Sequence, residues 1–183
     1  METMFPGMAA LQNNIHPLLI HFPIAFFLGA LAMEGLAVLR DEKFHLVATW
    51  MLYLGTLSGL VALPTGFIAA NLVAATDPRG HNAPGHDFIH IHRNWMVATT
   101  ALGVLLTGYL IWINKKGKWA SHRWGFLLGL VVLSALVALG ADRGGRLVFE
   151  FGTGVNPAVI KAAFQESGED HGNEHRSDGG KPI

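Results

Sequence analysis

Histidine is the residue type in this chain with the greatest capacity for chemistry. The 183 residues include ten histidines and no cysteine. Neutral imidazole is the commonest protein ligand of haem iron, copper and zinc. A chain without cysteine has no disulfides, no thiolate-bound iron–sulfur cluster and no covalently attached c-type haem. Eight histidines lie before the polar C-terminal tail, at His16, His21, His45, His81, His86, His90, His92 and His122.

Two of these histidines each open an apolar run. His21 lies just inside the run that starts near residue 18, where an unpaired polar ring would be costly, and His92 precedes the run that starts near residue 95. On regular helices each stands above a stripe of mostly small residues, which are Ala25, Leu28, Ala32 and Gly35 below His21 and Met96, Thr100, Gly103 and Thr107 below His92. We expect the two stripes to pack together. Such packing would bring His21 and His92 to one cavity as the axial ligands of a b-type haem.

His16 and Arg93 are further candidates for the haem site. His16 lies about 140° round a regular helix from His21, so we expect it to act as a second ligand, a helix cap or a partner that orients another ring. Arg93 follows His92 directly. Its guanidinium either pairs with a haem propionate or is solvated at the membrane interface. The same two roles are open to Arg79, Arg143 and Arg146.

His86 and His90 form an alternative metal site. They have the i, i+4 spacing of neighbours on one helical face, and Asp87 lies beside them. This pattern suits zinc or copper as well as it suits haem. The sequence does not choose between the haem and the metal, and both remain hypotheses.

The elements that must position these side chains are four apolar runs. Only 14% of the residues are charged, well below the roughly one quarter that is typical of soluble domains. The runs cover about residues 18–39, 46–75, 95–113 and 124–141, and roughly 20 apolar residues suffice for a helix to cross a bilayer. We therefore predict an all-α fold, a bundle of four transmembrane helices, with a kink near Pro64 in the second.

The C-terminal part should lie outside the bundle. Residues 144–155 are too short and too rich in glycine for another crossing, so we expect them on the surface. Asn156 and Pro157 are a good helix start for a short interfacial segment. Residues 166–183 are glycine-rich and polar, which predicts a disordered tail. The chain thus reads as one membrane domain, residues 1–165, followed by a tail.

The basic residues predict the orientation. The turns after the first and third runs carry Arg40, Lys43, Lys115, Lys116, Lys118 and Arg123. By the positive-inside rule these turns face the cytoplasm and both termini lie outside. Glu34, near the inner end of the first run, is a functional candidate by default because it is ionisable. We favour a simpler role, in which it snorkels to the interface and pairs there with Arg40, His45 or His122.

Two motifs resemble a known family. The segment 16–25, His-Pro-Leu-Leu-Ile-His-Phe-Pro-Ile-Ala, and the segment 144–155, Gly-Gly-Arg-Leu-Val-Phe-Glu-Phe-Gly-Thr-Gly-Val, are similar to those of a bacterial four-helix membrane family, the domain of unknown function 2231. The resemblance covers about residues 16–155. It implies a four-span domain of the bacterial inner membrane with a haem or metal role, and it supports His16, His21 and His92 as site residues.

Together these patterns predict an electron-transfer subunit rather than an independent enzyme. We expect haem b as the cofactor, with the lipid bilayer and a periplasmic or membrane redox protein as partners. The alternatives are a copper or zinc binding or transport module and a structural subunit without a cofactor. The sequence contains no nucleophile elbow, phosphate loop or zinc-protease helix. Its formal net charge of zero gives no reason to expect nucleic acid, and the oligomeric state stays open.

Overall fold

The computed structural model describes residues 14–76, 82 and 85–153, and most of these residues are helical. The helices are α2 (His16–Leu19), α3 (His21–Leu39), α4 (Phe44–Thr76), α5 (His86–Lys115) and α6 (Trp119–Phe149). Four stretches are long and apolar enough to cross a membrane, at His16–Leu39, Phe44–Leu72, His86–Lys115 and Trp119–Phe149. No strand occurs in the described part of the chain. The predicted all-α bundle of four membrane helices is confirmed.

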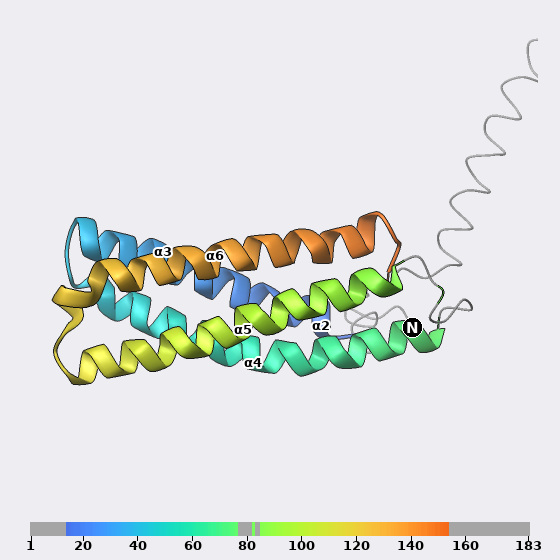
Figure 1. The fold of residues 1–183 in the computed structure, drawn as a ribbon, viewed down its shortest axis with the longest axis horizontal. Helices are drawn as coiled ribbons and strands as arrows, with labels where there is room; N and C mark the ends of the chain where they lie inside the picture. Colours follow the sequence, from blue (N-terminus) through green and yellow to red (C-terminus); the bar gives the residue numbers. More distant parts are fainter. Residues whose placement is uncertain (1–13, 77–81, 83–84, 154–183) are drawn as a thin grey trace, which may run out of the picture.

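The four long helices run antiparallel to their neighbours in the chain (Figure 1). Helix α3 packs on α4 and α6, and α5 also packs on α4 and α6, so α3 and α5 face each other across the diagonal of the bundle. Residues 40–43 and 116–118 make the turns at one end, which we call the turn end. We call the opposite end, where α2 and the start of α5 lie, the histidine end.

Close contacts around Phe27 hold the centre of the bundle together. The ring is buried, and two glycines of neighbouring helices lie against it. A Cβ at Gly55 of α4 would lie 2.7 Å from Phe27 Cδ1, and a Cβ at Gly103 of α5 would lie 2.9 Å from Phe27 Cζ. The missing side chains therefore leave room for the Phe27 ring of α3 against α4 and α5, as small residues do in membrane bundles. Further buried residues of this core are Leu52, Leu110, Ile113, Phe126, Leu130 and Leu133.

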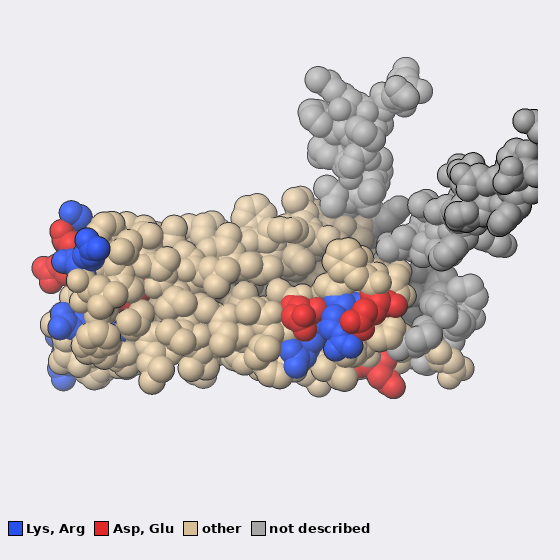
Figure 2. All heavy atoms as spheres, turned by 90° about the horizontal axis from the view of Figure 1, so that it is seen from above, with Lys and Arg blue, Asp and Glu red and all other residues tan. Residues whose placement is uncertain are grey.

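The charged side chains lie near the two ends of the bundle. Figure 2 shows Lys, Arg, Asp and Glu gathered at both ends, with a mostly uncharged surface between them. The apolar side chains on that middle surface include Leu57, Leu105, Leu128 and Val131, which are 61%, 69%, 63% and 47% exposed. An uncharged belt of exposed aliphatic side chains is what a lipid-facing surface requires.

Two helices are longer than the sequence predicted. Helix α5 begins at His86 rather than near Trp95, and α6 continues beyond Ala141 to Phe149. The expectation that residues 144–149 form a separate surface segment was therefore wrong. This last part of α6 is held by packing, because Leu147 is buried. Beyond the end of α6 the chain turns at Gly152, whose φ of 63° is the left-handed conformation that closes many helices.

The predicted packing of the two stripes below His21 and His92 was also wrong. On α3, Ala25, Leu28 and Ala32 are exposed. On α5, Thr100 and Gly103 are buried, and they lie near α4 and the Phe27 ring rather than near the stripe of α3. The diagonal placement of α3 and α5 explains the difference.

Some predictions lie outside the described residues. These are the interfacial helix from Asn156, the disordered tail 166–183, and the roles of Arg79 and His81. The kink at Pro64 stays a prediction, since α4 is helical on both sides of this proline.

Candidate functional sites at the two ends of the bundle

His16 lies at the start of α2 with its ring against α4. Its Nδ1 is 3.0 Å from Thr65 Oγ1, and that hydroxyl donates its own hydrogen to the carbonyl oxygen of Ala62 at 2.7 Å. The hydroxyl oxygen must therefore accept from His16 Nδ1–H. In the neutral ring the lone pair then belongs to Nε2. Gly66 makes room for the imidazole, since a Cβ there would lie 2.9 Å from His16 Cε1.

His92 on α5 has the same arrangement against α6. Its Nδ1 is 3.0 Å from the carbonyl oxygen of Gly140, and a carbonyl oxygen only accepts, so Nδ1 carries the hydrogen. The lone pair of the neutral ring again lies on Nε2. Gly144 lies beside the ring, where a Cβ would be 3.1 Å from His92 Cε1. A backbone carbonyl that accepts from Nδ1–H is a common way to orient a metal-bound imidazole.

The two rings lie at the same end of the bundle. They are near enough for their charges to interact, and both are partly buried. Arg143 of α6 also interacts with His92, and its guanidinium lies 4.2 Å from the ring centroid of Trp95. The histidine end thus contains two imidazoles with free Nε2 lone pairs beside a cation.

The other predicted site residues at this end lie in different surroundings. His21 is exposed, and its Nδ1 is 3.4 Å from the carbonyl oxygen of Leu18. The guanidinium of Arg93 lies 5.6 Å from the ring centroid of Phe67 on α4. The histidine that interacts with His92 is therefore His16.

His86 and His90 meet on the first turn of α5. Their Nε2 atoms are 3.2 Å apart, and their rings are nearly perpendicular at a centroid distance of 4.9 Å. His92 does not join them in a larger metal cluster. Within the described ranges, no group of three or more His, Cys, Asp or Glu side chains is arranged to hold a metal ion.

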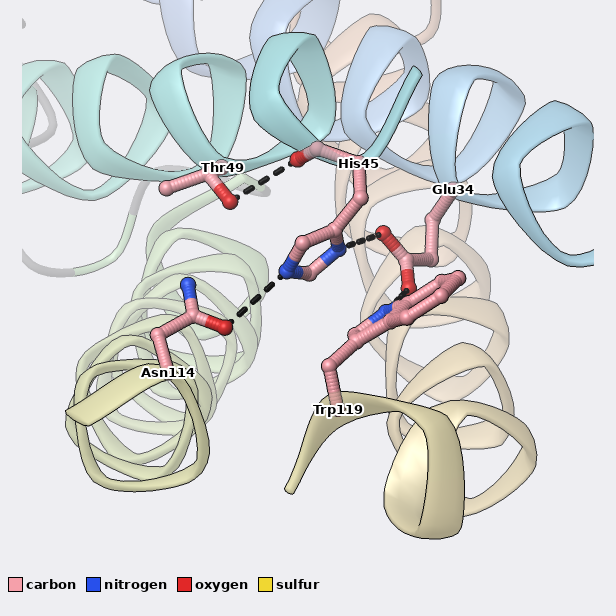
Figure 3. Close-up of polar contacts among 5 residues, drawn as sticks. All are labelled: Glu34, His45, Thr49, Asn114 and Trp119. Carbon is pink, nitrogen blue, oxygen red and sulfur yellow. Dashed lines mark hydrogen bonds and ion pairs between the residues drawn. The ribbon is translucent and has the colours of Figure 1, made fainter. Parts of the chain in front are cut away.

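The turn end contains a polar cluster to which each of the four long helices contributes one side chain (Figure 3). Glu34 of α3 accepts a hydrogen bond from His45 Nδ1 of α4 at 2.7 Å and another from Trp119 Nε1 of α6 at 2.7 Å. His45 Nε2 is 3.0 Å from Asn114 Oδ1 of α5. We call these four residues the Glu34 cluster.

Burial increases from the surface of the Glu34 cluster to its centre. Asn114 is exposed, the His45 side chain is 15% exposed, and Glu34 is fully buried. The His45 ring also packs on the Trp119 ring, at a centroid distance of 4.8 Å. The buried carboxylate is thus connected to the surface through the imidazole of His45.

The outcome for Glu34 is mixed. Of the three predicted partners, Arg40, His45 and His122, the structure shows His45 paired with Glu34. The predicted snorkelling to the interface is wrong, because the carboxylate is completely buried. His122 is bonded elsewhere, with Nδ1 2.7 Å from the hydroxyl of Tyr109. The sequence reasoning missed Asn114 and Trp119, although both lie next to the predicted turn after the third run.

Comparison with known proteins gives one match. A family model described as "Predicted membrane protein (DUF2231)" matches residues 12–157, a range that contains both ends of the bundle. No curated protein and no solved structure matches the chain.

Proposed function

We propose that this chain, which belongs to the DUF2231 family of predicted membrane proteins, is an electron-transfer subunit that binds one b-type haem through His16 and His92. The supporting observation is that the two rings are held in the same way at one end of the bundle. Each donates Nδ1–H to a protein oxygen, so each has its Nε2 lone pair available, and the two imidazoles are near enough for their charges to interact. An imidazole fixed in this way is ready to bind a metal through Nε2.

The number of ligands favours haem over zinc at this end. Porphyrin supplies four nitrogens to iron, so two imidazoles complete the coordination. Zinc takes three or four protein ligands, and no third histidine or carboxylate joins these two among the residues that the structure describes. Bound haem would supply one-electron chemistry, which the side chains themselves lack. Arg143, beside His92, is the residue best placed to pair with a propionate.

The orientation of the bundle in the membrane follows from the basic residues in its turns. With the basic turns in the cytoplasm, the histidine end faces the outside of a bacterial inner membrane, and both termini lie there. A redox partner would then be a periplasmic or membrane protein. Arg93, engaged with Phe67 on α4, would help to hold the start of α5.

The haem is tested by a reduced-minus-oxidised absorption spectrum of the purified protein from cells supplied with a haem precursor. We expect b-type bands in the wild type and their loss in His16→Ala and in His92→Ala. The matched control His21→Ala should keep them, because that ring is exposed. A wild-type spectrum without haem bands would refute the proposal. Loss in His21→Ala with retention in His16→Ala would refute this choice of ligands.

A second candidate function is copper or zinc binding by His86 and His90. The observation that favours it is the distance of 3.2 Å between their Nε2 atoms. A metal about 2.05 Å from both nitrogens would make an N–metal–N angle of about 100°, close to tetrahedral. Because no third His, Cys, Asp or Glu joins these two among the described residues, water would have to supply the remaining ligands. Titration of the purified protein with Zn²⁺ or Cu²⁺ tests it. One metal per chain, lost in His90→Ala and kept in His122→Ala, supports this function, and equal binding by both variants refutes it.

A further inference from the structure

The hydrogen bonds of the Glu34 cluster define where its protons are. Both ring nitrogens of His45 face oxygen atoms, Glu34 Oε2 at 2.7 Å and Asn114 Oδ1 at 3.0 Å. Each contact needs one hydrogen. Trp119 Nε1 can only donate, and it donates to Glu34 Oε1 at 2.7 Å. The pair of Glu34 and His45 therefore holds two exchangeable hydrogens in this arrangement, and its net charge is zero.

The same side chains can also satisfy the hydrogen bonds of Glu34 and His45 after one proton has left this pair. If Nε2 of His45 loses its hydrogen, it becomes an acceptor, while Nδ1–H still donates to the Glu34 carboxylate. The amide of Asn114 then presents its NH₂ to Nε2 after a half turn about its terminal bond, which exchanges its donor and acceptor. Both ring nitrogens of His45 and both carboxylate oxygens of Glu34 keep a partner in both states. This matters because an unpaired buried polar group is costly.

The route for the proton is short. Glu34 is fully buried, but His45 reaches the surface through its Nε2 side, where the exposed Asn114 lies. Water at the turn end can therefore deliver a proton to Nε2 and take it back without opening the bundle. We propose that Glu34 and His45 form a proton-binding site that exchanges one proton with the aqueous phase at the turn end. This site is independent of the proposed haem.

The neighbouring charges are engaged elsewhere. Lys43 pairs with Asp41 at 2.9 Å, Lys118 lies over the Trp112 ring at 5.7 Å, and His122 is bonded to Tyr109. Glu34 is thus the charged group in direct contact with His45, and its carboxylate is what favours the protonated imidazole. The remaining basic groups of the helices and turns at this end, which oppose protonation, are Arg40, Lys115, Lys116 and Arg123.

The test is a nitrogen-15 NMR titration of the full-length protein in detergent micelles between about pH 5 and pH 9, the window in which histidine titrates. The protein carries labelled histidine, and His45 is assigned from the signal that Asn114→Ala shifts. We expect Nε2 of His45 to lose its hydrogen in one step while Nδ1 keeps its own. In Glu34→Gln the proton affinity of His45 should fall by about tenfold or more, since an opposite charge in contact is lost. The control Glu42→Gln removes an exposed carboxylate of the turn and should leave the midpoint unchanged.

A second variant covers the case in which Glu34→Gln does not fold. Asn114 is exposed, so Asn114→Asp changes a surface residue and places a carboxylate at Nε2, which should raise the proton affinity of His45 by about tenfold. Two results would overturn the proposal. One is an Nε2 hydrogen of His45 that stays unchanged through the whole titration. The other is a midpoint that neither variant moves.

Discussion

Replacing Glu34 by alanine should strongly destabilise the bundle. The substitution removes two hydrogen bonds of 2.7 Å and leaves the Nδ1–H of His45 and the Nε1–H of Trp119 without their acceptor. Each lost bond to a charged acceptor contributes about 1.5–3 kcal/mol. Breaking a buried ion pair by removing one partner costs about 3–5 kcal/mol in total. We expect the stability of Glu34→Ala to fall by an amount near the lower end of this range, because side chains in membranes find other partners in the unfolded state.

The assay is unfolding by sodium dodecyl sulfate in mixed micelles, followed by circular dichroism. Glu34→Gln keeps the volume and one acceptor oxygen but sets an NH₂ group against a donor, so about half of the loss is expected. Glu42→Ala is the matched control, because this glutamate is exposed in the turn. A loss of less than about 0.5 kcal/mol in Glu34→Ala, within the range of surface substitutions, would refute the view that the cluster holds the four helices together.

Two further predictions concern close packing and pH. Gly55→Ala places a Cβ 2.7 Å from Phe27 Cδ1 and should cost about 1–3 kcal/mol in the same unfolding assay. The control Gly125→Ala meets nothing within 4 Å and should stay within about 1 kcal/mol of the wild type. Equal effects of the two substitutions would contradict the packing described. Hydrogen bonds from Lys43 lower the pKa of Asp41, so this contact stabilises the fold above the unfolded-state pKa and is lost as pH falls through the folded-state pKa. The difference in melting temperature between the wild type and Asp41→Asn should therefore shrink in acid, and a difference that is constant with pH would exclude this contribution.

The sequence was sufficient to predict the number and approximate positions of the spans. Uncharged runs of about twenty residues have few alternatives to a membrane helix. The start of α5 and the end of α6 were less predictable, because His86–Arg93 is rich in polar residues and Gly144–Phe149 begins with two glycines, so neither segment continues an apolar run. Their helical state depends on contacts between the two helices, such as His92 with Gly140 and Gly144.

The candidate sites were harder to predict than the spans. In a bilayer both the lipid-facing and the core-facing sides of a helix are apolar, so the stripe below His21 did not indicate which neighbour it meets. His16 differs from His21 through its contacts with Thr65 and Gly66 of α4, which no local pattern reveals. Glu34 was recognisable as a lone ionisable residue in a span, but one of its two partners, Trp119, lies 85 residues further along the chain.

The Glu34 cluster also has a consequence for the biogenesis of the protein. Glu34 enters the membrane with α3, before the other three long helices, and its partner His45 follows on α4. Trp119, which satisfies the other carboxylate oxygen, is made only when α6 emerges. The carboxylate therefore lacks one of its two bonds until the last helix is inserted. A chain truncated before α6 would expose this defect, and the cell's quality control could recognise it as an unfinished membrane protein.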